Sequence, residues 1–282
     1  MLSEEEKISA LSKEQIEQYQ RDGYIVPDYR LPPEKVEKLQ KMMQQIVRDN
    51  PTLLNQPIIC PNVRNSGVQG LKVDDPEGWM DVATDPQILD IMEALIGPDL
   101  ILWGSALFYK APHKGLPTPW HRDGRFFPIK PLETSSVWIA IYDSVIENGC
   151  LRVIPGSHLA RDLGVHVTTP TTTAILQEVL SETEYDESQA VDIELKAGQM
   201  VIFDVYTTHG ANGNSGTLER GGFSLRFMPS TSHYDHAAAE RTDQPGGSWD
   251  TRPLFLLRGV DRCGKNDFTR GHPQPQAATE PS

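Results

Sequence analysis

Helical spacing of apolar residues dominates the first hundred positions of the chain. A capping box from Ser12 to Gln15 begins the first predicted helix, and Gly23 can end it in the left-handed conformation that glycine adopts most easily. A second helix is predicted to begin at Pro32-Pro33, and a third at Asp85, an N-cap residue that precedes a proline. Apolar side chains recur on one face of these two helices, at Val36, Leu39, Met43, Ile46, Ile88, Leu89, Met92, Leu95 and Ile96. We expect the helices to brace a sheet.

Strand-like patterns fill much of the remaining chain. Runs of β-branched, aromatic and apolar residues predict strands at residues 24–26, 100–110, 137–142, 150–154, 200–205 and 223–228. Glu147-Asn148-Gly149 supplies turn chemistry, so residues 137–154 are predicted to form a hairpin. Long connections between strands that are not adjacent in the chain favour a double-sheet jelly roll over a parallel sheet. The predicted fold is mainly β, with flanking helices.

Several segments lack a regular apolar period. Residues 50–79 mix proline, glycine and asparagine and are interpreted as a long loop, of the kind that often acts as a lid. Residues 181–192 are acidic and are expected to form a solvated loop, and residues 230–250 are rich in glycine, aspartate and alanine. The tail 271–282 is expected to be disordered. Residues 1–270 are predicted to form one domain.

Charge and cysteine content narrow the possible partners. The 282 residues carry a formal charge of −13, which disfavours binding to nucleic acid or to an anionic membrane surface. No apolar run approaches the ~20 residues that a membrane span needs. Cys60, Cys150 and Cys263 follow no metal-binding spacing and are interpreted as reduced thiols. We therefore expect a cytoplasmic protein whose partner is a small molecule. The sequence contains no signal for a particular oligomeric state.

A His-x-Asp motif carries the first candidate for metal chemistry. On an extended segment His121 and Asp123 point to the same face, about 6–7 Å apart along the backbone. They supply two of the three ligands of the 2-His-1-carboxylate triad. This triad binds Fe(II) and leaves the other coordination positions of the metal open for substrates and oxygen. A third ligand is expected at a strand end, where the scaffold is rigid. His209 fits this position, and His158 is the competing candidate.

An arginine downstream suits a dicarboxylate ligand. Arg220 follows His209 by eleven residues and lies just before the last predicted strand. A guanidinium offers a fixed fork of donors that pairs bidentately with a carboxylate. A cosubstrate chelated to iron at one end and ionised at the other requires such a partner. The alternative is an ordinary surface arginine beside Glu219.

Five motifs occur in a characteristic order: His121-x-Asp123, Glu147-Asn148-Gly149-Cys150, Ile154-Pro155-Gly156-Ser157-His158, His209-Gly210 and Arg220. Together they resemble the phytanoyl-CoA dioxygenase family of Fe(II)/2-oxoglutarate oxygenases, from about Leu11 to Gly259. The resemblance implies a double-stranded β-helix, a cupin-like jelly-roll core. It also implies Fe(II) bound by His121, Asp123 and His209, and 2-oxoglutarate bound by Arg220 in a pocket lined by Trp138.

The same resemblance implies the reaction. Members use O2 to decarboxylate 2-oxoglutarate to succinate and CO2 while a substrate carbon is hydroxylated. Related halogenases replace the aspartate by a small residue, so Asp123 implies hydroxylation. Two positions depart from the family pattern. Arg122 stands where relatives most often carry glutamine, and Ala211 where some place a serine that helps to bind 2-oxoglutarate, so Arg220 is expected to carry more of that binding.

The predicted substrate is a small polar metabolite, anionic or zwitterionic, such as an amino-acid-like or aminophosphonate-like molecule. If the extended run continues beyond Asp123, Arg125 and Phe127 point into the same cavity as the metal ligands. A cation beside an aromatic ring suits an anionic substrate group, whereas pairing of Arg125 with a surface carboxylate is the alternative. The same chemistry on an acyl-CoA or a secondary metabolite is a further alternative. A metal-dependent hydrolase would give Arg220 no role, and a non-catalytic jelly-roll binding module would need neither the triad nor the arginine.

Overall fold

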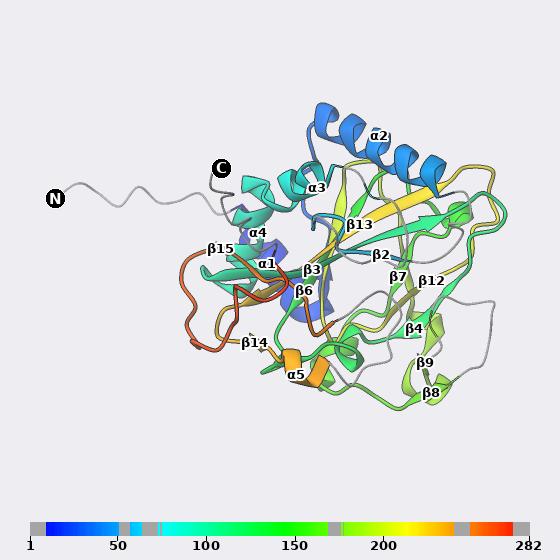
Figure 1. Ribbon diagram of the computed structural model, residues 1–282. Helices are drawn as coiled ribbons and strands as arrows, with labels where there is room; N and C mark the ends of the chain where they lie inside the picture. The colour runs from blue at the N-terminus through cyan, green and yellow to red at the C-terminus, as the bar shows by residue number, and fades with distance from the viewer. Residues whose placement is uncertain are drawn as a thin grey trace, which may run out of the picture.

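A computed structural model describes residues 10–50, 57–63, 73, 75–168, 176, 178–239 and 249–272. Two antiparallel sheets face each other, and helices from the N-terminal third of the chain pack on the outer face of the larger sheet (Figure 1). This is the jelly-roll arrangement that the strand pattern predicts. In the described part of the chain no helix is both long and apolar enough to cross a membrane.

The larger sheet has seven strands. Their spatial order is β1 (Tyr24–Ile25), β11 (Met200–Asp204), β6 (Ser135–Ala140), β13 (Arg220–Pro229), β3 (Leu100–Lys110) and β15 (Phe255–Arg258), and β2 (Ile58–Ile59) also pairs with β3. Side chains on β13 alternate between the two faces of the sheet. Phe223 and Phe227 belong to the core under the helices, whereas Arg220, Ser224 and Arg226 line a pocket between the sheets.

The smaller sheet has four strands, in the order β10 (Val191–Ile193), β7 (Leu151–Val153), β12 (His209–Ala211) and β4 (Thr118–His121). Two further strand pairs are β5 (Ile129–Lys130) with β14 (His233–Tyr234) and β8 (His166–Thr168) with β9 (Glu178–Leu180). Short 3-10 helices occupy η1 (Asp123–Arg125), η2 (Ile146–Asn148), η3 (Ser157–Ala160), η4 (Glu182–Glu184) and η5 (Glu187–Gln189). Apolar side chains from both sheets, including Trp138, Phe203, Leu151 and Val153, pack between them.

The predicted helices are confirmed. The α-helices are α1 (Lys13–Asp22), α2 (Pro33–Asp49), α3 (Pro76–Ala83), α4 (Pro86–Ile96) and α5 (His236–Ala239). Ser12 forms the predicted capping box on α1, and Gly23 ends that helix with a φ of 79°. The residues that α2 buries are the four selected by periodicity, and Asp85 caps α4. Figure 1 shows α2, α3 and α4 gathered on one side of the strands, away from the β8–β9 pair.

The predicted hairpin over residues 137–154 is wrong. β6 pairs with β11 and β13 in the larger sheet, whereas β7 pairs with β10 and β12 in the smaller one. The turn itself exists, because η2 ends at Gly149 with a φ of 81°. The chain uses this turn to pass from one sheet to the other. Both strands bury one face between the sheets, so their apolar patterns are alike and do not show which sheet each strand joins.

Residues 50–79 are not one continuous loop, because β2 and the start of α3 lie within them. The other parts of this predicted lid, at 51–56, 64–72 and 74, lie outside the described residues. So do residues 240–248 of the predicted 230–250 loop, and residues 273–282 of the predicted tail. The acidic segment 181–192 contains η4, η5 and the first residues of β10, and its side chains are mostly exposed, as expected.

Candidate functional site

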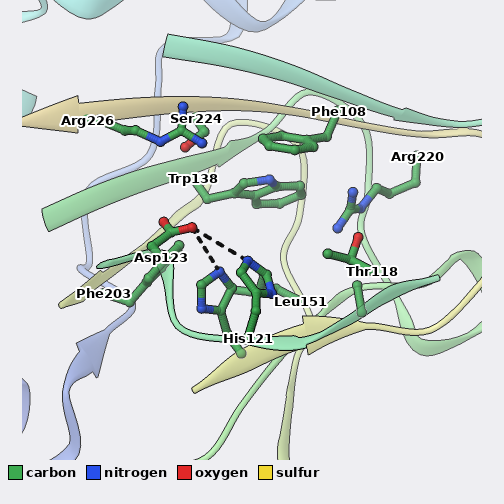
Figure 2. Close-up of a pocket in the computed structure, with 12 residues that line it drawn as sticks. Phe108, Thr118, His121, Asp123, Trp138, Leu151, Phe203, Arg220, Ser224 and Arg226 are labelled. Carbon is green, nitrogen blue, oxygen red and sulfur yellow. Dashed lines mark ion pairs between the residues drawn. The ribbon is translucent and has the colours of Figure 1, made fainter. Parts of the chain in front are cut away.

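His121, Asp123 and His209 lie together between the two sheets. His121 is the last residue of β4 and His209 the first of β12, and the antiparallel register places them opposite each other. Asp123 begins η1, directly after β4. The possible ligand atoms of these buried residues all lie within 4.8 Å of one another. Figure 2 shows the Asp123 carboxylate directed at two imidazole rings.

Backbone carbonyls hold both imidazoles in one tautomer. His121 Nδ1 lies 2.8 Å from the Pro119 carbonyl oxygen, and His209 Nδ1 lies 2.9 Å from that of Thr207. A carbonyl oxygen only accepts, so each Nδ1 must carry the proton and each Nε2 keeps a free lone pair. Metal-binding histidines are commonly oriented by such a bond from their second nitrogen.

The three donors fit one first-row metal ion. The Nε2 atoms of His121 and His209 lie 3.5 Å and 3.9 Å from Asp123 Oδ1. Donors at bond lengths of about 2 Å from one metal, on neighbouring coordination positions, are separated by roughly 3 Å, so only small movements are needed. Asp123 Oδ2 accepts a hydrogen bond from Ser136 Oγ at 3.3 Å, which leaves Oδ1 for the metal.

The surroundings keep His209 and Asp123 in metal-binding protonation states. Burial and the neighbouring His121 lower the pKa of His209 to about 4, so its imidazole is neutral at pH 7. Burial acts to raise the pKa of Asp123, but the adjacent His121 and His209 and the positive charge of Arg226 outweigh it, and that pKa lies well below its usual range. Neutral imidazoles and an ionised carboxylate are the forms that ligate metals.

Arg220 and Trp138 lie together at one end of the same pocket. The Arg220 side chain is buried, and its Cζ lies 4.5 Å from the centroid of the Trp138 ring. Its Nε has no hydrogen-bond partner among the residues that the structure describes. Burial lowers the pKa of Arg220 to about 10, so the guanidinium still carries its charge at pH 7. A buried, charged fork without a carboxylate partner is suited to a carboxylate from a ligand.

Lys110 lies beside Arg220 but is already engaged. The two residues are cross-strand partners on β3 and β13. Lys110 Nζ donates to the backbone carbonyls of Ala211 and Asn212. Burial, followed by the charge of Arg220, lowers the pKa of Lys110 to about 6. At pH 7 Arg220 is therefore the principal cation at this end of the pocket.

Gly222 makes room for Trp138. A Cβ atom at Gly222 would lie 1.9 Å from Trp138 Cζ2, and the two residues lie on directly paired strands. We expect Gly222→Ala to displace the indole from Arg220 and to destabilise the fold by about 1–3 kcal/mol, as overpacking does. Chemical denaturation and a 2-oxoglutarate titration measure the two effects.

Gly221→Ala is the matched control, because its Cβ points to the opposite face and comes no closer than 3.1 Å to Tyr142. This contact is tight, but Tyr142 is not one of the residues that line the pocket. Equal destabilisation by the two variants, with unchanged 2-oxoglutarate binding in Gly222→Ala, would show that Gly222 does not set the position of the indole.

His158, the competing third ligand, lies elsewhere. It is buried in η3, and its Nε2 lies 3.1 Å from the Gln20 carbonyl oxygen. The described His/Asp cluster contains His209 instead. Arg122, between the two ligands of the His-x-Asp motif, donates from Nε to Thr208 Oγ1 at 3.0 Å and also pairs with Asp162. Arg122 therefore holds the side chain of Thr208, which precedes His209 in the chain.

Arg125 and Phe127 do not line the pocket. The chain turns into η1 at Asp123 instead of staying extended, so the expected alternation of side chains ends there. The Arg125 side chain is 48% exposed, and its Nε lies 3.1 Å from Glu178 Oε2. Phe127 packs edge-on against Trp103, with ring centroids 4.5 Å apart. The expected position of these two residues beside the metal ligands is wrong, and a direct role in substrate binding stays a prediction.

Three polar residues of the pocket lining, Thr118, Ser224 and Arg226, were not predicted from the sequence. Thr118 is the cross-strand partner of Ala211 and lies beside Arg220 (Figure 2). Arg226 lies two strand periods beyond Gly222 on the inward face of β13. The alternation of side chains along β13 could have predicted the position of Arg226, because every second residue after Arg220 faces the same side of the sheet.

Comparison with known sequences places the chain in a family. Residues 19–222 match the family described as Phytanoyl-CoA dioxygenase (PhyH). Ectoine dioxygenase of Sphingopyxis alaskensis is 26% identical over 266 residues, which cover 88% of this chain and 83% of that protein. Peroxisomal phytanoyl-CoA dioxygenase of Homo sapiens is 24% identical over 242 residues, 80% of this chain and 71% of that protein. A Dictyostelium discoideum homolog of phytanoyl-CoA dioxygenase domain-containing protein 1 is 32% identical over 110 residues, only 38% of this chain and 39% of that protein.

Solved structures show the same fold. CytC3 with Fe(II) and alpha-ketoglutarate matches 90% of this chain and 91% of its own, with a TM-score of 0.63 and 25% identity. The apo structure of the non-heme monooxygenase ThoJ matches 88% of this chain and 84% of its own, with a TM-score of 0.66 and 23% identity. The family match spans most of the chain and includes the His-Asp-His cluster. The chain therefore belongs to the phytanoyl-CoA dioxygenase family of enzymes, whose cofactors are Fe(II), 2-oxoglutarate and O2.

Proposed function

We propose that this enzyme hydroxylates an unactivated C–H bond of a small anionic or zwitterionic metabolite, with Fe(II) bound by His121, Asp123 and His209. The observation that carries the proposal is the convergence of one carboxylate and two unprotonated Nε2 atoms in a buried pocket. Bound Fe(II) supplies O2 activation, coupled to conversion of 2-oxoglutarate to succinate and CO2. Asp123 occupies the ligand position that halogenases of this kind leave open, which supports hydroxylation.

The protein positions its ligands through rigid neighbours. Pro119 and Thr207 fix the two imidazoles through their carbonyls, and Ser136 fixes the carboxylate. Because β4 and β12 are directly paired, their backbones hold the two histidines opposite each other. This support reduces the rearrangement that metal binding requires.

Arg220 binds the distal carboxylate of 2-oxoglutarate in this proposal. Trp138 forms one wall of that site, stacked on the guanidinium. Ala211 cannot donate a hydrogen bond, but Thr118 lies opposite it on the neighbouring strand and offers a hydroxyl beside Arg220. Thr118 therefore supplies the side-chain donor that Ala211 lacks. Phe108, Leu151 and Phe203 complete a largely apolar lining that excludes water.

Pocket size and overall charge favour a small substrate. The pocket encloses about 440 Å³, part of it open to solvent, and the cosubstrate must share this space. The relatives include both an ectoine dioxygenase and phytanoyl-CoA dioxygenases. Similarity to them therefore does not distinguish a small metabolite from an acyl-CoA as the substrate of this enzyme. The charge of −13 offers no general attraction for the phosphates of coenzyme A. An acyl-CoA or a secondary metabolite is the second candidate.

Substrate-dependent succinate formation tests this function. The purified enzyme with Fe(II), 2-oxoglutarate and O2 is screened against amino acids, aminophosphonates, small carboxylic acids, acyl-CoA thioesters and uncharged lipophilic compounds. We expect a small anion or zwitterion to stimulate release of succinate in proportion to hydroxylated product. Stimulation by thioesters or uncharged compounds alone would contradict the substrate class. Hydrolysis products without succinate would contradict the reaction.

A further inference from the structure

Arg226 is a second buried cation in the metal pocket. It lies on β13 opposite Gly104 and Ser136, and its side chain points into the space between the sheets. Figure 2 shows Arg226 and Arg220 at opposite ends of the pocket, with Asp123 near the Arg226 end and His121 between the two ends. The six-residue separation along one strand corresponds to about 20 Å of backbone. Arg226 therefore lies on the side of the triad away from the proposed 2-oxoglutarate site.

Within the described residues the Arg226 guanidinium forms no salt bridge, and the carboxylate whose charge acts on it, Asp123, is one of the three proposed metal ligands. Only 8% of Arg226 is exposed, and no described residue forms a hydrogen bond with its Nε. Instead its Cζ lies 5.0 Å from the centroid of the Phe127 ring and 5.8 Å from that of Trp103. The aromatic faces support the cation from one side and leave its donors available on the other. Phe127 thus contributes to the pocket indirectly, beneath Arg226.

The local structure adds positive charge around Arg226. A Cβ at Gly104 would lie 3.7 Å from Arg226 Cδ and 3.8 Å from Arg252 Nη1, so the two side chains share the space that this glycine leaves. Arg252 is buried and donates to Cys60 Sγ at 3.0 Å. A cysteine sulfur is a weaker hydrogen-bond acceptor than a carboxylate oxygen. In the described part of the chain neither guanidinium forms a salt bridge with a carboxylate. Two such groups near one another favour an incoming anion.

The charge balance of the site with Fe(II) and 2-oxoglutarate bound also favours an anionic group beside Arg226. The charge of Asp123 interacts with Arg226, but in the loaded enzyme Asp123 ligates the metal. A divalent metal, the Asp123 carboxylate, Arg220, Arg226 and dianionic 2-oxoglutarate leave one positive charge in the buried pocket, even before Arg252 is counted. Burial of an unbalanced charge is unfavourable, so a monoanionic group beside Arg226 stabilises the complete site.

We infer that the Arg226 guanidinium, together with the neighbouring Ser224 hydroxyl, binds the carboxylate or phosphonate group of the substrate. This inference rests on the proposed function and names the residues that select its substrate class. Ser224 precedes Arg226 by one strand period and lies beside it in Figure 2. An anionic group held there places the adjoining carbon chain over the open side of the triad, between the two arginines.

A comparison of each acid with its primary amide tests the role of Arg226 in turnover. The best acidic substrate from the screen and its amide are compared in the parent enzyme, Arg226→Gln, Arg226→Lys and the surface control Arg21→Gln. We expect Arg226→Gln to raise the KM of the acid on the order of 100-fold and to remove most of the acid-over-amide preference. Arg226→Lys restores part of this preference because it keeps the charge. Arg21 is paired with Asp22 on the surface, and Arg21→Gln keeps the parent preference.

A merely structural role for Arg226 would affect both compounds equally, since the amide has nearly the same shape. Equal losses for acid and amide in Arg226→Gln would therefore overturn the inference. A loss of the acid preference in Arg125→Gln instead would return this role to the residue indicated by sequence spacing.

Binding of a probe anion separates this inference from the proposed reaction. Methylphosphonate is titrated, without O2, into enzyme loaded with Fe(II) and saturating 2-oxoglutarate, and its binding is followed by calorimetry. We expect saturable binding that weakens at least about 10-fold in Arg226→Gln. Absence of binding to the parent enzyme, or equal binding to both, would overturn the anion site. Binding that depends on Arg226 without succinate formation from any compound would contradict the proposed function and leave the anion site standing.

Discussion

His209→Ala is expected to abolish both Fe(II) binding and turnover. The variant leaves only His121 and Asp123, two donors from one short stretch of chain, and places an alanine opposite His121 on β12. Residues that only orient a ligand typically contribute roughly 10–100-fold to metal affinity, so loss of a ligand should exceed that range. Metal content after anaerobic loading and dialysis measures binding, and succinate release measures turnover. His121→Ala and Asp123→Ala are expected to behave in the same way.

His158→Ala is the matched control for the metal site. Both histidines are buried, so both variants remove a similar volume, but His158 contacts the Gln20 carbonyl and packs near Gly23. We expect His158→Ala to lower stability while the folded enzyme keeps its iron. Full iron occupancy in His209→Ala, with loss in His158→Ala, would assign the third ligand to His158 and refute the triad described above.

Local sequence signals were sufficient for α1, α2 and α4, whereas α3 and α5 were not predicted. The capping box at Ser12, the N-cap at Asp85 and the apolar period of α2 act within a few residues of chain, so each could be read without knowledge of the fold. The pairing of β6 and β7 depends on strands far away in sequence, and here the expected hairpin failed. A strand of either sheet buries one apolar face in the core between the sheets. The apolar pattern of a strand therefore does not show to which sheet it belongs.

The candidate ligands were predicted for a reason that is only partly right. Spacing assumed that His121 and Asp123 share one face of an extended strand, but Asp123 begins η1. The motif still brings both side chains to one point, because the turn redirects the carboxylate towards the imidazole. The same turn misplaced Arg125, whereas strict alternation on β13 places Arg226 in the pocket. Periodicity was reliable where the strand continued and failed where it ended.

Arg220→Ala is expected to raise the KM for 2-oxoglutarate on the order of 100-fold while Fe(II) binding stays intact. The variant removes a charge-assisted pair in a largely dry pocket, a loss of about 2–3 kcal/mol. Lys110 cannot replace it, because Nζ is bonded to two backbone carbonyls and burial lowers its pKa to about 6. Steady-state kinetics with varied 2-oxoglutarate, together with metal analysis, separate this effect from loss of a metal ligand.

A monocarboxylic 2-oxo acid sharpens the test of Arg220. Pyruvate offers the same chelating end as 2-oxoglutarate but no distal carboxylate, so the parent enzyme should strongly prefer 2-oxoglutarate. Arg220→Ala should lose most of that preference, and Arg220→Lys should recover part of it because a cation remains over Trp138. Arg262→Ala serves as control, since Arg262 pairs with Asp99 at the surface and faces no part of the pocket lining. An unchanged preference in Arg220→Ala, or a larger loss in Arg226→Ala, would move the cosubstrate carboxylate to the other end of the pocket, and the substrate anion with it.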